Sequence, residues 1–142
     1  MGTTTVTCTA NDAAGQAGTA AFTVQVQDTT APIIGTVTPN PGSLWPPNHK
    51  MVNVTVVANA TDLRTPPVCT IAGATSSEPD NGQGDGDTAG DIGPFSGLGI
   101  SLRAERGGKG SGRVYTLTVS CTDGINASTK TATVTVPKSQ GK

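Results

Sequence analysis

The fold is decided most clearly by residues 114–121, which read VYTLTVSC. Apolar and hydroxyl side chains alternate along this stretch, and a period of two residues indicates a β-strand with one buried face. We therefore expect Tyr115, Leu117, Val119 and Cys121 to point inward, and the intervening Thr and Ser side chains to point outward.

The same alternation recurs along the chain and predicts further strands. The expected strands cover residues 4–10, 20–27, 33–38, 52–62, 68–74, 98–104, 114–121 and 132–136. A Gly- and Asp-rich stretch, residues 76–97, is expected to form a long loop. No stretch has a period of 3.6 residues, so we expect no helix. Roughly six strands between residues 33 and 137 predict an all-β fold, a β-sandwich.

The chain contains an internal repeat. Residues 4–27 and residues 114–136 both read as an alternating strand, an Asp-containing turn and a second alternating strand. The first copy is expected to be the closing hairpin of a partial second sandwich; alternatively, its strands join the main sandwich as extra edges. The expected boundaries are a hairpin at 1–28, a linker at 29–32, a sandwich at 33–137 and a polar tail at 138–142.

The composition excludes several classes of function. Charged residues make up 13% of the chain and the formal net charge is −1, which gives no electrostatic attraction to nucleic acid. No apolar run approaches the roughly 20 residues that a membrane helix needs. No nucleophile or acid–base constellation is evident, so we expect a protein without catalytic activity.

Two parts of the chain resemble known extracellular modules. Residues 5–16, 22–26 and 28–32, which read TVTCTANDAAGQ, FTVQV and DTTAP, resemble the C-terminal half of a HYR (hyalin repeat) domain. Residues 44–51, 84–88, 102–106 and 112–115, which read LWPPNHKM, GDGDT, LRAER and GRVY, resemble an immunoglobulin-like repeat of large bacterial surface and secreted proteins.

The resemblance implies an immunoglobulin-like β-sandwich located outside the cell, secreted or on the cell surface. It implies a structural or adhesion repeat whose partners are neighbouring immunoglobulin-like domains of the same or another chain. Two alternatives remain open: a module that binds a carbohydrate or protein ligand, and a fibre subunit that assembles by strand addition.

The pairing of the three cysteines indicates whether the protein belongs in an oxidising compartment. Cys69 and Cys121 lie on the apolar faces of expected strands, 121 − 69 = 52 residues apart. We expect a disulfide that joins the two sheets, which an oxidising compartment permits; the alternative is two buried thiols. Cys8 is then a free thiol, or links two chains.

An acidic, Gly-rich loop is the candidate metal site. Asp85 and Asp87 are the best candidate ligands, with Asp80 and Asp91 nearby. Oxygen ligands on a flexible loop suit Ca²⁺, although the spacing does not satisfy an EF-hand. The alternative is a solvated loop whose Asp side chains cap turns.

The single Trp and the single His lie close together at Trp45 and His49, beside Lys50. The segment is an exposed recognition corner, or else Trp45 caps the core and the Pro-Pro pair turns the chain. Pro46 or Pro47 is a candidate for a cis peptide bond.

Basic residues gather around one turn near the end of the chain. Arg103 and Glu105 are expected to share the outward face of their strand, close to Arg113. Their simplest role is an exposed cross-strand ion pair, worth under about 1 kcal/mol.

Overall fold

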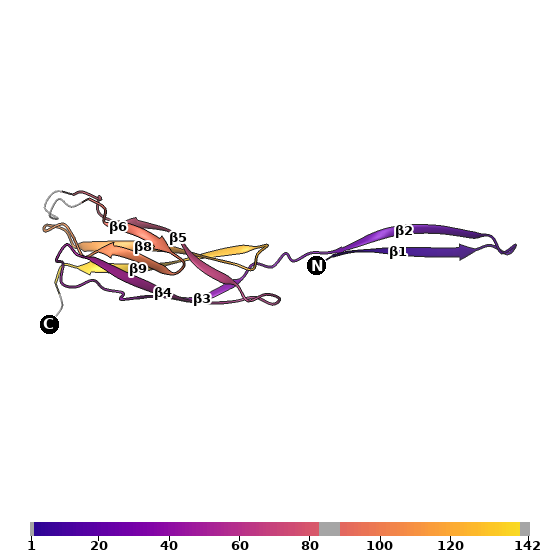
Figure 1. Ribbon diagram of the computed structural model, residues 1–142, viewed down its shortest axis with the longest axis horizontal. Helices are drawn as coiled ribbons and strands as arrows, with labels where there is room; N and C mark the ends of the chain where they lie inside the picture. Colours follow the sequence, from indigo (N-terminus) through magenta and orange to yellow (C-terminus); the bar gives the residue numbers. More distant parts are fainter. Residues whose placement is uncertain (1, 83–88, 140–142) are drawn as a thin grey trace. The chain divides into compact units, whose positions relative to one another are not determined.

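The computed structural model describes residues 2–82 and 89–139. The chain divides into two compact units, Met1–Thr30 and Ala31–Lys142 (Figure 1). All the regular structure in the described residues is β-strand, and none of it is helix, which confirms the predicted all-β class.

The first unit is an antiparallel hairpin of β1 (Gly2–Asn11) and β2 (Ala17–Val26). Asp12 closes the turn, because its Oδ1 accepts hydrogen bonds from the backbone N–H groups of Ala14 and Gln16 at 2.9 and 2.8 Å. Almost every residue of the two strands is exposed, and Phe22 retains 55% of its surface. The hairpin therefore has no buried core of its own.

The second unit is a β-sandwich of two antiparallel sheets, as Figure 1 shows. One sheet has the order β3-β4-β7-β6 and the other the order β5-β8-β9. The strands are β3 (Ile33–Asn40), β4 (Met51–Thr61), β5 (Val68–Ser76), β6 (Ile92–Ser96), β7 (Gly99–Arg103), β8 (Gly112–Thr122) and β9 (Ala127–Pro137).

The expected loop at residues 76–97 contains a strand that the sequence pattern missed. β6 is an edge strand that pairs with β7, and its register shifts between Ile92 and Phe95. Gly93 and Pro94 fall within this shift and interrupt the alternation of side chains. Proline is tolerated at a bulge on an edge strand, where its missing N–H costs no ladder hydrogen bond.

The core lies between the two sheets and is built mainly on β8. Tyr115, Leu117, Val119 and Cys121 are all fully buried, as predicted. Facing and neighbouring strands supply the other buried apolar residues: Leu44, Val54, Val56, Ile71, Ile100, Leu102, Ala104, Val134 and Val136. Aliphatic side chains thus supply most of the hydrophobic stabilisation.

Cys69 and Cys121 form a disulfide, which confirms the expected pair. The two residues lie directly opposite one another on β5 and β8, which are neighbours in one sheet. The expectation that the bridge joins two sheets is therefore wrong. Side-chain alternation reports which face a cysteine occupies, and both residues do face the core, but alternation does not report which strand lies beside which.

Candidate functional site

The described residues of the sandwich contain a buried cluster of charged side chains. Asp91 and Arg113 are both fully buried, and the Arg113 guanidinium donates a hydrogen bond to the Asp91 carboxylate. Arg113 Nε lies 3.3 Å from Glu78 Oε2, and Arg103 Nε lies 3.3 Å from Asp91 Oδ1. Because each buried charge has a counter-charge beside it, the cluster offsets much of the cost of removing these groups from water.

The alternation of β8 places Arg113 in this cluster. It lies two residues before Tyr115 and therefore on the same inward face. The Tyr115 hydroxyl donates to the Arg103 carbonyl at 2.8 Å. Burial raises the pKa of Tyr115 to about 12, so the phenol stays protonated as a donor. Burial would lower the pKa of Arg113, but its hydrogen bond to Asp91 holds that pKa above its usual value.

Glu105 occupies the same interior and is fully buried. The expected exposed pair of Arg103 and Glu105 is therefore wrong. β7 ends at Arg103, so the period of two no longer applies and both Ala104 and Glu105 turn inward. Glu105 Oε2 lies 2.7 Å from His49 Nδ1, whereas its Oε1 has no hydrogen-bond partner in the described part of the chain.

The Glu105 contact fixes the corner that contains His49. The His49 backbone N–H donates to the Ala104 carbonyl at 3.0 Å, and Arg103 donates to the His49 carbonyl at 2.9 Å. His49 has a φ of 62°, a left-handed conformation that few residues other than Gly adopt. These contacts hold the corner against the end of the sandwich.

Trp45 lies on the surface of that corner. Its exposed fraction is 41%, whereas Leu44 beside it is 1% exposed. Leu44, and not Trp45, belongs to the buried core cluster here. The expected cis bond is present between Trp45 and Pro46. Lys50 is exposed as well, so the corner presents an indole, an imidazole and an ammonium group to solvent.

Of the four predicted calcium ligands, Asp85 and Asp87 lie outside the described residues. The other two are engaged by protein groups. Asp80 accepts hydrogen bonds from the backbone N–H groups of Gly90 and Asp91, at 3.0 and 2.7 Å, and the Asp91 carboxylate is paired with Arg113. Asp80 thus joins the two ends of the loop to each other, and Asp91 binds the second end to Arg113 on β8.

The bonds to Asp80 predict a dependence of stability on acid. The backbone N–H groups of Gly90 and Asp91 hold the pKa of Asp80 below its ordinary value of 3.8. A carboxyl group with a lowered pKa in the folded state stabilises the fold above the unfolded pKa and loses that contribution as the pH falls through the folded pKa. Urea midpoints should therefore fall below pH 3.8 less steeply in Asp80→Asn than in the unchanged chain. Equal slopes would contradict this assignment.

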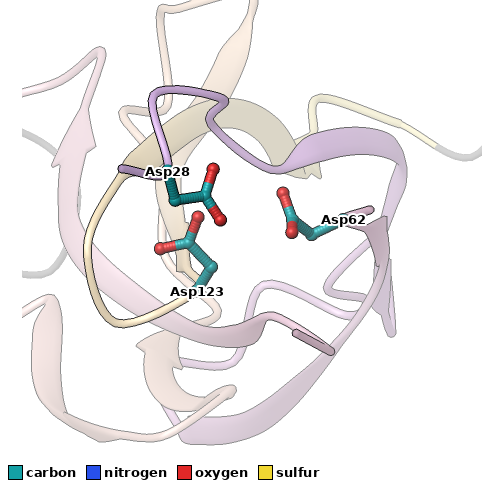
Figure 2. A group of neighbouring side chains, drawn as sticks. All are labelled: Asp28, Asp62 and Asp123. Atoms are coloured by element: carbon teal, nitrogen blue, oxygen red, sulfur yellow. The ribbon is translucent and has the colours of Figure 1, made fainter. Parts of the chain in front are cut away.

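A second group of carboxylates was not predicted. Figure 2 shows Asp62 and Asp123, and one carboxylate oxygen of each lies within 4.8 Å of the other. Asp123 Oδ1 accepts from the backbone N–H of Asn126, and Asp62 Oδ1 from that of Arg64. Asp28, also drawn, belongs to the first unit, where its Oδ1 accepts from Thr30 N–H. The sequence marks all three only as turn residues.

The chemistry of this second group is that of oxygen ligands. Backbone hydrogen bonds from Asn126 and Ile125 lower the pKa of Asp123, so this carboxylate stays ionised at neutral pH. Asp62 Oδ2 is buried without a hydrogen-bond partner among the described residues. Two carboxylates that approach this closely repel one another unless a cation or a proton lies between them. Hard cations such as Ca²⁺ prefer this type of ligand.

The chain matches no family model, no curated protein and no solved structure. Its helix-free described part contains no segment that could cross a membrane as a helix. The fold therefore defines the class: an all-β protein in which a hairpin unit precedes a β-sandwich with a cross-strand disulfide.

Proposed function

We propose that this chain is a non-catalytic structural or adhesive repeat module of an extracellular protein, in which the sandwich transmits tension between neighbouring modules. The disulfide between Cys69 and Cys121 suits an oxidising extracellular compartment. The repeated hairpin suits a protein built from tandem sandwiches. The resemblance to bacterial surface repeats points in the same direction.

The observation that carries the proposal is how the first and last strands of the sandwich meet. β3 and the segment after it run parallel to β9, so positions 32, 35 and 44 approach positions 128, 130 and 135 in turn. Ser128 Oγ donates to the Pro32 carbonyl at 2.6 Å, and Lys130 Nζ donates to the Gly35 carbonyl.

Two backbone hydrogen bonds complete this contact. Leu44 N–H donates to the Thr135 carbonyl at 2.8 Å, and Thr135 N–H donates to the Gly42 carbonyl at 3.1 Å. Tension enters at the start of β3 and leaves at the end of β9. Because the two segments are parallel, this tension shears all their contacts together and does not open them one at a time. Contacts that are loaded together in shear resist a higher force than contacts that open one at a time, which suits a module that bears load.

Replacing Thr135 with proline tests the proposal. Proline removes both the N–H and the hydroxyl that donate to the Gly42 carbonyl, and leaves the carbonyl of residue 135 in place. This N–H points away from β8, so the sheet ladder stays intact. We expect Thr135→Pro to lower the force of unfolding in single-molecule pulling from the two ends of the chain. At equilibrium it should cost only about 1 kcal/mol.

Thr133→Pro is the matched control. Thr133 lies two residues earlier on β9, and the register with β8 is unbroken, so its N–H points to the same outer side. No bond of this N–H to the segment 42–44 is present among the backbone bonds outside the strands. If both variants unfold at the same force, or if the unchanged chain extends without a discrete unfolding event, the tension-bearing role is wrong.

A further inference from the structure

The two hairpins share a five-residue motif around a cysteine. Residues 5–9 of β1 read TVTCT and residues 118–122 of β8 read TVSCT, so they differ only where Thr7 replaces Ser120. Each motif is followed by a turn that an Asp side chain closes, and then by the second strand of the hairpin. Cys8 therefore occupies in the first hairpin the position that Cys121 occupies in the second.

The neighbours of the two motifs differ. β8 lies between β9 and β5, and Cys69 on β5 is directly opposite Cys121 and bonded to it. Among the described residues β1 pairs only with β2, and no strand lies at its other edge. Cys8 is a free thiol and is exposed. The first hairpin thus has the cysteine of a disulfide-bridged sheet but not the strand that would complete it.

The face on which Cys8 lies is apolar. Val6 is directly opposite Phe22, and the alternation places Val24 and Val26 on the same face. Phe22, Val24 and Val26 are 55%, 44% and 50% exposed. A further strand would extend this face, and its backbone would satisfy the open N–H and C=O groups at the edge of β1.

We propose that the free edge of β1 is a docking site for an antiparallel strand that carries a cysteine opposite Cys8, and that the two cysteines form a disulfide. The equivalent edge of β8 identifies the occupant: β5 places Ile71 opposite Val119 in addition to its cysteine. The strand that docks on β1 therefore has a branched apolar residue opposite Val6. This inference rests on the repeat architecture proposed above.

A second copy of the chain fits this edge less well. If two β1 strands pair about Cys8, each Val6 lies opposite Ala10, two residues beyond the cysteine, and meets only a methyl group. A strand like β5 provides a larger apolar partner at the same position. Packing therefore favours a heterologous strand over a β1–β1 dimer.

Disulfide formation needs an oxidant, which a small disulfide such as oxidised glutathione supplies. The Cys8 thiolate attacks one glutathione sulfur and releases the first reduced glutathione. The thiolate of the docked strand then attacks the Cys8 sulfur and releases the second. The two cysteines together lose two electrons and two protons, and one oxidised glutathione becomes two reduced glutathiones.

The test uses the full chain and a synthetic peptide with the sequence of residues 66–77, PPVCTIAGATSS, in a glutathione redox buffer. The control peptide, PPVTCIAGATSS, exchanges the cysteine with the next residue, so that its thiol lies on the opposite face. Mass spectrometry measures the mixed disulfide at Cys8. We expect the in-register peptide to be captured about tenfold more than the control peptide at equilibrium.

A variant of the protein shows whether peptide capture depends on strand register or only on the reactivity of an exposed thiol. In the double variant Cys8→Ser with Thr7→Cys, the thiol moves to the other face of β1. In the same register it then lies opposite the cysteine of the control peptide, so the preference should reverse in favour of the control peptide. Amide hydrogen exchange at the outer edge of β1 should slow only in the captured complex. Equal capture of both peptides, or a Cys8–Cys8 dimer that persists in excess peptide, would overturn the proposal.

The result of the peptide-capture experiment does not depend on the tension-bearing role of the sandwich. That role depends on residues 32–44 and on β9, all in the second unit, and the pulling experiment reads only their contacts. If peptide capture fails while Thr135→Pro still weakens the sandwich, the docking edge is wrong and the proposed function stands. The reverse result would leave the docking site without the load-bearing role.

Discussion

Replacing Arg113 with methionine is expected to lower the free energy of unfolding of the sandwich by about 3–5 kcal/mol. Methionine retains an unbranched apolar side chain, shorter than that of arginine, and removes the charge. Asp91, which is fully buried, then loses the guanidinium that donates to its carboxylate. Among the described residues Asp91 then keeps Arg103, whose Nε lies 3.3 Å from its Oδ1 without a hydrogen bond. A buried carboxylate that loses its hydrogen-bonded counter-charge is costly because water does not solvate it. Urea denaturation, followed by Trp45 fluorescence and by circular dichroism, measures the change.

Two further variants make this expectation specific. Arg64→Met removes an exposed cation and should change stability by no more than about 0.5 kcal/mol. Arg113→Met combined with Asp91→Leu replaces the buried pair with apolar groups and should recover most of the loss. If Arg113→Met alone stays within about 1 kcal/mol of the unchanged chain, the buried cluster does not hold this part of the sandwich together.

Removing the disulfide is expected to have the second large effect. The bridge joins residues 52 positions apart. Closing a loop of this size restricts the unfolded chain and contributes about 4 kcal/mol in the chain-entropy model. The double variant Cys69→Ala with Cys121→Ala should lose this amount in urea denaturation, and a reductant should have no further effect on it.

Cys8→Ala is the matched control for the disulfide. Cys8 is exposed on a hairpin that has no buried core, so its removal should leave the stability of the sandwich unchanged. If the double variant is as stable as Cys8→Ala without reductant, the bridge does not stabilise the fold.

The regular strands could be predicted from the sequence because their side chains alternate. The inward face of β8 follows directly from its pattern, and Leu117 and Val119 are fully buried as expected. β6 could not be predicted in the same way. Gly93 and Pro94 carry no alternating pattern, and only the pairing with β7, whose register shifts between Ile92 and Phe95, identifies the segment as an edge strand.

Only part of the buried charged cluster could be predicted from the sequence. Extending the alternation of β8 back from Tyr115 by one period reaches Arg113, so a signal for its burial existed. The charge of arginine argued for an exposed position, because a lone buried guanidinium is very unfavourable. Its partner Asp91 lies 22 residues away, and only the folded structure brings the two together. Glu105 follows the end of its strand, where alternation gives no guidance.

The state of the three cysteines decides whether the sandwich is bridged, and intact mass measures this state. The chain is denatured without reductant, treated with a thiol-alkylating reagent, and weighed. One alkyl group per monomer, located at Cys8, is the expected result, because Cys69 and Cys121 are bonded to one another. Three alkyl groups on the monomer would contradict the account, since the sandwich would lack its bridge and Cys121 would offer no precedent for a disulfide at Cys8.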